Sequence, residues 1–231
     1  MNFAKAFRAA LNPRYWPALA RAVVPTIEHA PALASLDPAT VIDVGANKGQ
    51  FSRFAACRWP DATIVAFEPL PRPARKYLSV LGKRATLFTC ALGAEEGLLD
   101  MHVASRDDSS SLLSLGDRQK SLFRMDEVAT VPVEVHRLDK VSAGRVTPPA
   151  LLKIDVQGYE YEVIQGLGEL IRKIEWIYVE TSFVELYSGQ RLHHEVATLL
   201  ADLGYEQELE HNVMMDGAQK VQADILFRRR S

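Results

Sequence analysis

The sequence predicts an α/β fold in which helices cover both faces of one mostly parallel sheet. Three observations predict it. Short apolar runs alternate with amphipathic helical segments, the runs are apolar at every position, and the connections between them are short. A strand that is apolar throughout is buried on both faces, which is typical of a parallel sheet. A chain of 231 residues is short enough to form one core, so we expect a single domain.

The first half of this pattern reads as strand, helix, strand, helix, strand. The apolar and amphipathic periods place these elements at 41–44, 50–58, 63–67, 72–81 and 86–91. The two helices end at a Trp-Pro-Asp sequence and at Gly82, which are ordinary helix stops.

The second half is interrupted before it resumes. We expect strands at 97–105 and 131–138 on either side of a polar, serine-rich loop, within an insertion at 94–149 between the third and fourth core strands. The core then continues with a strand at 151–156, a helix at 159–171, a strand at 174–180, a helix at 192–203, and paired strands at 205–213 and 221–228 around an Asp-Gly turn. A seven-stranded, mostly parallel sheet with an antiparallel C-terminal strand matches the Rossmann-like class I methyltransferase architecture, here at 39–231.

Residues 1–38 are expected to form a short helical arm. This segment carries no acidic residue before Glu28, and three prolines interrupt its first 30 residues. We expect the arm to pack on the domain or to lie over the site. The alternative is loose contact with an anionic membrane surface through Phe3, Phe7 and Trp16. No apolar run is long enough to span a membrane, and no signal-peptide pattern occurs, so we expect a cytoplasmic protein.

Charge and cysteine content narrow the classes of function. Charged residues make up 24% of the chain and the formal net charge is −2, which gives no electrostatic reason to expect a nucleic-acid partner. Cys57 and Cys90 form no metal-binding spacing and are expected to be small buried residues.

Right-handed crossovers bring every strand-to-helix turn to one edge of a parallel sheet, so the chemistry is expected there. In the sequence VIDVGANKGQFS (41–52), Gly45 and Gly49 frame the first such turn. Asn47 stands where a dinucleotide site needs its middle glycine, and the turn also lacks the ending of a P-loop. Asp43 would repel a pyrophosphate but would attract the ammonium group of an amino acid.

Three further carboxylates end core strands. Glu68, in the sequence AFEP, can accept hydrogen bonds from both hydroxyls of an adenosine ribose; otherwise it is a surface residue before a turn. Asp155, in LLKIDVQGYE, can take a proton from a hydroxyl or hold a metal ion. Glu180 is either a second ligand or acceptor contact, or a carboxylate that braces a loop.

Taken together, these motifs resemble the FkbM-type methyltransferases. The sequences VIDVGANKGQFS, FEP, DSSSLL, LLKIDVQGYE, ETSF with LYSGQ, and ADILF occur in that family's typical order over about residues 40–230. The resemblance implies S-adenosylmethionine as the methyl donor and O-methylation of a sugar, glycan, glycolipid, lipid-linked sugar or polyketide. By position it implies a donor-binding set of Asp43, Gly45, Ala46, Asn47, Gly49, Glu68, Pro69, Ala91, Ser109, Ser110 and Asp155.

For catalysis, Asp155 is the first choice as base, with Glu180, His194 or His211 as helpers. His29, His102 and His136 are expected to be surface or strand residues. Asp155 and Glu180 form a carboxylate pair suited to Mg²⁺, although no spacing demands a metal. A nicotinamide-dependent oxidoreductase and a non-catalytic Rossmann-like binding module are the alternatives. The insertion and the arm are expected to build the acceptor pocket or a contact within a homo-oligomer.

Overall fold

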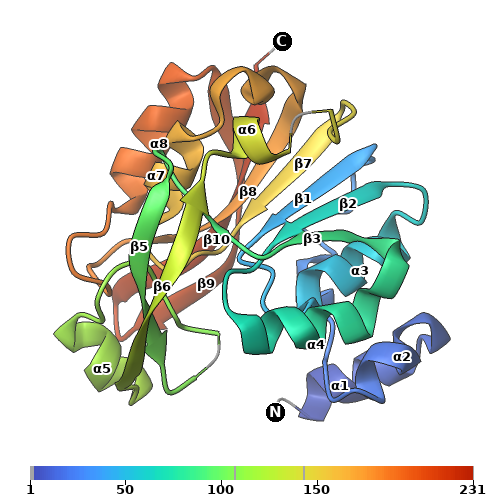
Figure 1. Cartoon of the computed structure of the whole chain (residues 1–231), viewed down its shortest axis with the longest axis horizontal. Coiled ribbons are helices and arrows are strands. Elements are labelled where there is room, and N and C mark those ends of the chain that lie inside the picture. The colour runs from blue at the N-terminus through green and yellow to red at the C-terminus, as the bar shows by residue number, and fades with distance from the viewer. Residues whose placement is uncertain (1–2, 107, 143, 231) are drawn as a thin grey trace.

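A computed structural model describes residues 3–106, 108–142 and 144–230. Its main sheet has the strand order β3-β2-β1-β7-β8-β10-β9 (Figure 1). β10 runs antiparallel to β8 and β9, and the other neighbouring pairs are parallel. The expected sheet is therefore confirmed. The strands are β1 (Thr40–Val44), β2 (Thr63–Phe67), β3 (Thr86–Phe88), β7 (Ala150–Ile154), β8 (Ile174–Ser182), β9 (Tyr205–Asp216) and β10 (Gln219–Arg229).

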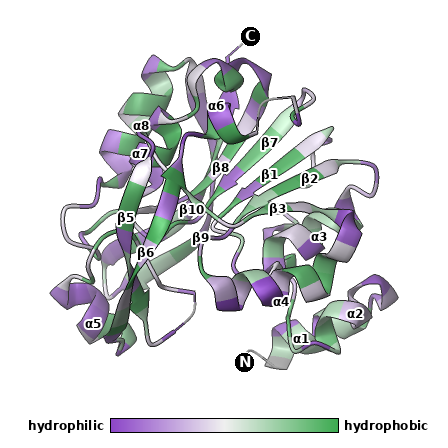
Figure 2. Cartoon of the chain, viewed as in Figure 1, coloured by the Kyte–Doolittle hydropathy of each residue, from purple (hydrophilic) through white to green (hydrophobic). Residues whose placement is uncertain are grey.

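Alternate residues of β1 enter two different cores. Val41 packs with α3 (Gln50–Arg58) on one face, whereas Ile42 and Val44 pack with α7 (Glu160–Gln165) and α8 (His193–Asp202) on the other. All five residues of β1 are buried. Figure 2 shows the same arrangement, with hydrophobic strands at the centre and hydrophilic positions on the outer helices. Asp43 lies one residue from both Ile42 and Val44, so its side chain is on the α3 face.

The insertion forms a second sheet with the order β4-β6-β5. It contains β4 (Ala91–Leu92), β5 (Gly97–Ala104) and β6 (Glu127–His136), together with the short helices α5 (Asp117–Phe123) and α6 (Leu138–Val141). The expected single strand at 86–91 was wrong. Residues 86–88 pair in the main sheet, and the chain then turns so that Ala91 and Leu92 pair with β6 in the second sheet.

The expected helix at 159–171 is also shorter than predicted. α7 ends at Gln165, and a separate 3-10 helix covers Gly168–Lys173. Gly168 has a φ of +46°, which a continuous helix does not accommodate. Gly166 packs so closely that a Cβ atom there would lie 2.2 Å from the Gly93 carbonyl oxygen. A close backbone contact with Gly93, just before the insertion, therefore interrupts the helical pattern.

The N-terminal arm contains α1 (Phe3–Ala10), two 3-10 turns (Pro13–Tyr15 and Ile27–His29) and α2 (Trp16–Leu19). Ala18 and Val23 join an apolar cluster with Tyr77 and Leu81 of α4 (Pro71–Leu81), so the arm packs against the domain (Figure 1). Among the described residues, no helix is long and apolar enough to cross a membrane. A domain boundary at residue 38 stays a prediction.

We expect Gly166→Ala to lower the free energy of unfolding by about 1–3 kcal/mol, because overpacking a tight backbone contact displaces α7 or the insertion. Chemical denaturation measures the change. Gly97→Ala is the matched control, since a Cβ atom at Gly97 meets nothing within 4 Å. Equal stability of the two variants would contradict the role assigned to this contact.

Candidate active site

A cavity of about 460 Å³ lies at the C-terminal ends of β1, β2 and β7. Its walls come from the turns that follow these strands, from the N-terminal arm and from the serine-rich loop of the insertion. The volume falls within the range of small-molecule sites, and the position is the one expected for an open parallel sheet.

The floor of the cavity is backbone rather than side chain. Gly45, with φ +77°, lies so close to the next turn that a Cβ atom would be 1.9 Å from the Asp155 carbonyl oxygen. The Asp155 amide also donates a hydrogen bond to the Val44 carbonyl oxygen, 3.1 Å away. Gly45 and the neighbouring Ala46 and Asn47 line the cavity. Gly49 is not part of the lining, because it packs beneath the turn against Tyr77 and Leu81.

Glu68 is oriented by two backbone amides. Its Oε2 atom accepts a hydrogen bond from Asn47 N (2.9 Å), and its Oε1 atom accepts one from Leu70 N (2.8 Å). Each carboxylate oxygen keeps a second lone pair, and the residue lines the cavity together with Pro69. Burial raises the pKa of Glu68 to about 7. A ligand that donates two hydrogen bonds fits this arrangement.

The structure places Asp43 beneath the floor rather than on it. Its side chain is fully buried and is not part of the cavity lining. Ser52 Oγ donates to Asp43 Oδ2 (2.6 Å), and Tyr77 OH donates to Ser52 Oγ (2.8 Å). Burial raises the pKa of Asp43, while the nearby Lys153 ammonium opposes this effect. The Asp43 carboxylate faces Lys153 and Ser52. In this geometry it is therefore not directed at the ammonium group of a ligand in the cavity.

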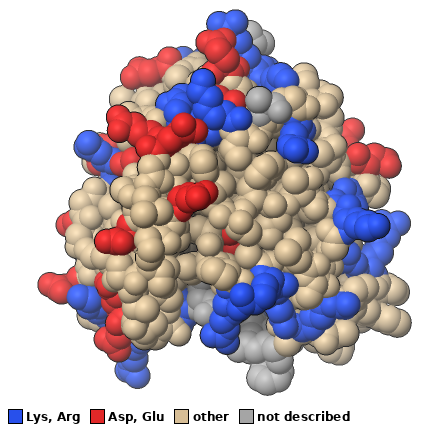
Figure 3. Space-filling view, viewed as in Figure 1, with Lys and Arg blue, Asp and Glu red and all other residues tan. Residues whose placement is uncertain are grey.

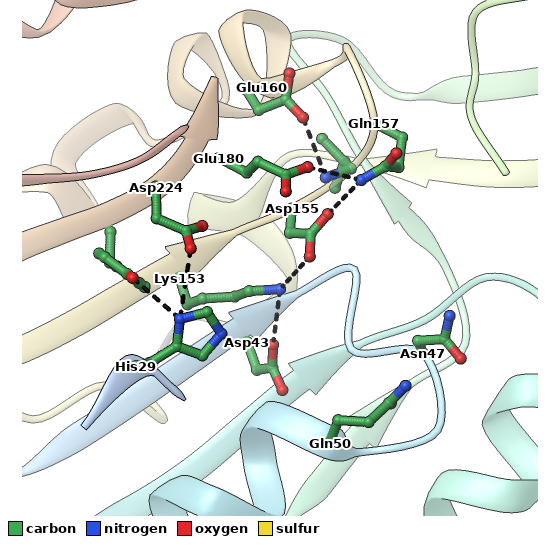
Figure 4. Close-up of polar contacts among 12 residues, drawn as sticks. His29, Asp43, Asn47, Gln50, Lys153, Asp155, Gln157, Glu160, Glu180 and Asp224 are labelled. Atoms are coloured by element: carbon green, nitrogen blue, oxygen red, sulfur yellow. Dashed lines mark hydrogen bonds and ion pairs between the residues drawn. The ribbon is translucent and has the colours of Figure 1, made fainter. Parts of the chain in front are cut away.

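Lys153 stands next to Asp43 in the sheet register of β1 and β7. Its Nζ atom lies 3.9 Å from Asp43 Oδ1 and 3.1 Å from Asp155 Oδ2 (Figure 4). Burial lowers the pKa of the Lys153 ammonium, but the charges of Asp155 and Asp43 outweigh burial and raise it. Burial likewise raises the pKa of Asp155, yet Lys153 and a hydrogen bond from Gln157 hold that pKa below its usual value. At neutral pH the site contains an ion pair.

Asp155 and Glu180 are bridged by an amide. Gln157 Nε2 donates to Asp155 Oδ1 (2.7 Å) and to Glu180 Oε2 (2.9 Å). Burial and the charge of Asp155 raise the pKa of Glu180 well above its usual value. Because an amide donor lies between them and Lys153 pairs with Asp155, these carboxylates do not form the oxygen-only ligand set that Mg²⁺ prefers. The described part of the chain also contains no group of three ligating side chains that could hold a metal ion.

Gln157 also ties the serine-rich loop to the site. Its carbonyl oxygen accepts a hydrogen bond from Ser111 Oγ (2.7 Å), and its Oε1 atom accepts one from Tyr187 OH (2.8 Å). Ser109 and Ser111 are buried, whereas Ser110 lines the cavity. The loop therefore presents alternate residues to the cavity. Asp107, which was expected in this loop, lies outside the described residues.

The remaining walls come from distant segments. Ala91 and Leu92 of β4 line the cavity, and so does Cys90, whose pKa burial raises to about 11, so the thiol stays protonated. The arm contributes Thr26 and His29. His29 is 9% exposed, so its expected surface position was wrong. Its neighbours Phe51 and Tyr178 pack edge-on against the imidazole ring and enclose it.

Three of the expected catalytic residues, Glu180, His194 and His211, do not line the cavity. His194 is exposed on α8. Glu180 reaches the site through Gln157. His211 lies on β9, and its Nε2 atom is 2.9 Å from the Glu28 carbonyl oxygen, so it contacts the arm. Sequence reasoning missed Gln157 and His29. Gln157 stands inside the LLKIDVQGYE motif, whereas no local pattern marks His29.

Comparisons with known proteins identify the family and agree with the fold. A family model described as the Methyltransferase FkbM domain matches residues 43–206. The chain is 32% identical over 164 residues to the 2-O-methyltransferase NoeI of Sinorhizobium fredii (strain NBRC 101917 / NGR234), covering 67% of each chain. It is 27% identical to the 31-O-demethyl-FK506 methyltransferase FkbM of Streptomyces tacrolimicus, covering 78% of this chain and 77% of the relative.

Solved structures show the same fold. The chain superposes on a TehB-like SAM-dependent methyltransferase from Corynebacterium glutamicum with a TM-score of 0.51 and 11% identity, covering 99% of this chain and 100% of that one. It superposes on Aeropyrum pernix fibrillarin, solved with natively bound S-adenosyl-L-methionine, with a TM-score of 0.50 and 13% identity, covering 96% and 76%.

We expect Lys153→Met to destabilise the protein by about 3–5 kcal/mol, because it leaves buried carboxylates without their cation. Denaturant titration measures the loss. The double variant Asp43→Asn/Lys153→Met should recover part of it, since one uncompensated charge is removed. Lys220→Met is the control: its ion pair with Glu210 is partly solvated, so we expect a change of at most about 1 kcal/mol. A Lys153→Met protein as stable as the wild type would contradict the role of this ion pair.

Proposed function

The chain belongs to the FkbM family of S-adenosylmethionine-dependent methyltransferases, and we propose that it methylates a hydroxyl oxygen of a sugar, glycan, glycolipid or polyketide-type acceptor. The family match sets aside the oxidoreductase and the non-catalytic binding module. The methyl donor supplies an electrophilic methyl group on a sulfonium. The protein must therefore bind the donor, orient an acceptor oxygen, exclude water and receive a proton.

The two ends of the cavity suit the two ends of the donor. We propose that the free lone pairs of Glu68 accept the ribose hydroxyls and that the open floor at 45–47 accommodates the amino-acid tail. The apolar side chains of Leu70, Leu92 and Met101 line the same cavity and suit the adenine ring. Four further members of the expected donor set, Pro69, Ala91, Ser110 and Asp155, also line this cavity, whereas Asp43, Gly49 and Ser109 do not.

The proposed class of acceptor rests on the polar residues in the wall of the cavity. Thr26, Asp108, Ser110 and Gln157 face the cavity from three separate segments. Hydroxyl, carboxylate and amide groups together supply both donors and acceptors, as a polyhydroxylated ligand requires. Two relatives are also named for O-methyl transfer or for an O-demethylated substrate, which supports oxygen as the methylated atom.

We propose that Asp155 is the fixed anion at the transfer centre. Both of its oxygens already accept hydrogen bonds, from Lys153 and Gln157, and its pKa is low. A carboxylate in this state favours a nearby sulfonium electrostatically. Glu180 then holds Gln157 in place, and His211 holds the arm. No step in this proposal passes through a metal ion.

The arm offers a route to lipid-linked acceptors. Phe7, Leu11 and Trp16 are 70%, 73% and 58% exposed, which is unusual for large apolar side chains. Figure 3 shows lysine and arginine side chains along the lower edge of the same view, over α4. We propose weak contact of this edge with an anionic membrane surface in the cytoplasm. A homo-oligomer stays a prediction.

Donor binding tests Glu68. We expect calorimetry to show S-adenosylmethionine binding that weakens as the pH falls through about 7, because protonation removes the acceptor capacity of the Glu68 carboxylate. Glu68→Gln should bind more weakly and lose this pH dependence. Glu134→Gln, on an exposed side chain, is the control, and NADH should not bind. Undiminished binding by Glu68→Gln would exclude the proposed ribose contact.

The acceptor class is tested with a panel of methyl glycosides, lipid-linked monosaccharides and macrolide alcohols, beside matched amines and thiols. We expect methyl transfer to hydroxyl compounds only. Asp155→Asn should bind the donor more weakly, because it loses the charge that faces the sulfonium. Its kcat/KM should fall by about 100-fold, a typical effect of removing a positioned electrostatic group. Asp216→Asn, at the hairpin turn, should leave kcat unchanged. Methylation of the amines or thiols alone would overturn the proposal.

A further inference from the structure

His29 lies above a row of polar residues that crosses the sheet on the α3 face. In the register of the sheet, Tyr178 of β8 stands beside Lys153, and Glu180 of β8 stands beside Asp224 of β10. The last turn of the arm places the His29 ring over this row, within the cavity lining. A segment far from the donor motif thus brings an imidazole to the reaction centre.

The Nδ1 edge of the His29 ring lies beside hydrogen-bonding groups. Nδ1 lies 3.0 Å from Tyr178 OH and 3.5 Å from Asp224 Oδ2. Asn212 Nδ2 donates to the same Asp224 oxygen (2.7 Å) and thereby fixes the carboxylate. Asn212 Nδ2 also lies 3.3 Å from Nδ1, but its shorter contact is the one to Asp224. With a carboxylate and a hydroxyl oxygen beside it, we infer that Nδ1 is the nitrogen that carries the proton. This is the arrangement in which a carboxylate orients a histidine for proton transfer.

The other nitrogen is directed away from these groups. In Figure 4, the second ring nitrogen points to the opposite side from Asp224. Within the described ranges of the chain, no hydrogen bond or ion pair of His29 Nε2 is found. Burial, followed by the charge of Lys153, lowers the pKa of His29 to about 3, so the imidazole is neutral at pH 7. Nε2 therefore presents a lone pair, and the ring lines the cavity.

Asp155 is less suited to receive a proton. Its Oδ2 atom accepts from Lys153 (3.1 Å) and its Oδ1 atom accepts from Gln157 (2.7 Å). Protonation of Asp155 would break one of these contacts and leave the Lys153 ammonium with a single buried partner, Asp43. His29 Nε2 can take a proton without losing any contact. The charges of Asp155 and of Asp224, which lies beside Nδ1, oppose the burial and the Lys153 charge that disfavour the imidazolium.

We propose that His29 Nε2 accepts the proton of the acceptor hydroxyl during methyl transfer. The acceptor oxygen forms a bond to the methyl carbon, the carbon–sulfur bond breaks, and its electron pair stays on the sulfur. The O–H bond breaks and the proton moves to Nε2, from which it leaves to solvent after product release. His29 thus acts as general base and Asp155 as fixed anion. This inference rests on the proposed hydroxyl acceptor.

The tautomer of His29 provides a test that needs no acceptor. Nitrogen NMR of the histidine-labelled protein at pH 7, assigned with the His29→Asn variant, distinguishes a protonated nitrogen from a bare one. We expect a neutral ring with the proton on Nδ1 and none on Nε2, with and without S-adenosylhomocysteine. A proton on Nε2, or a charged ring, would overturn the proposal.

Turnover provides the second test. In His29→Asn the new amide nitrogen replaces Nδ1 and can keep the contacts with Tyr178 and Asp224, while the base is removed. We expect donor affinity within twofold of the wild type, and kcat lower by at least about 100-fold on the best hydroxyl acceptor of the panel. In His29→Ala, added imidazole should restore part of the rate, which a packing defect would not allow. His136→Asn, on β6 of the second sheet and outside the cavity lining, is the control.

These outcomes separate the two proposals. A wild-type protein that binds the donor but methylates no hydroxyl in the panel refutes the acceptor class, and the NMR result then decides the assignment of His29. A His29→Asn enzyme that keeps wild-type kcat on a hydroxyl acceptor refutes His29 as the base and leaves the proposed function standing.

Discussion

The site depends on the burial of one ammonium group between two carboxylates. Lys153 is buried on a central strand, where an unpaired charge would be very costly, and Asp43 and Asp155 provide its counter-charges. The parallel register of β1 and β7 sets Asp43 beside Lys153, and the turn after β7 brings Asp155 back over it. The backbone of that turn contacts the backbone of Gly45. The ion pair, which holds the turn, therefore also sets the position of the cavity floor.

Around this centre, contacts between distant segments fix the walls. Gln157 follows β7 and contacts two other segments. It donates to Glu180 of β8, and it accepts from Ser111 of the serine-rich loop. The arm is held in turn by the terminal strands, because His211 contacts Glu28, and Asp224 and Tyr178 contact His29. Amides and hydroxyls, which keep their hydrogen-bonding capacity at any physiological pH, make most of these links. The titratable groups are concentrated at the reaction centre.

The sequence predicted the sheet and several residues that line the cavity at the ends of its strands, because the signals for both are local. Apolar runs mark buried strands, and right-handed crossovers bring Gly45 and Glu68 to one edge whatever the loops do. It failed where tertiary contacts decide. A close backbone contact at Gly166 interrupts a helical pattern, and pairing with β6 draws Ala91 and Leu92 away from β3. His29 lies 149 positions from Tyr178, its contact in the fold, so no window of sequence could reveal its place.

The arm precedes the segment that defines the family, since the family model begins at Asp43. Yet the arm supplies Thr26 and His29 to the same cavity as the family motifs. On the proposed assignments, a substitution in the arm changes the wall that meets the acceptor and leaves the first turn of the sheet and Glu68 as they are. The arm can then alter which acceptor is bound without altering how the donor is held.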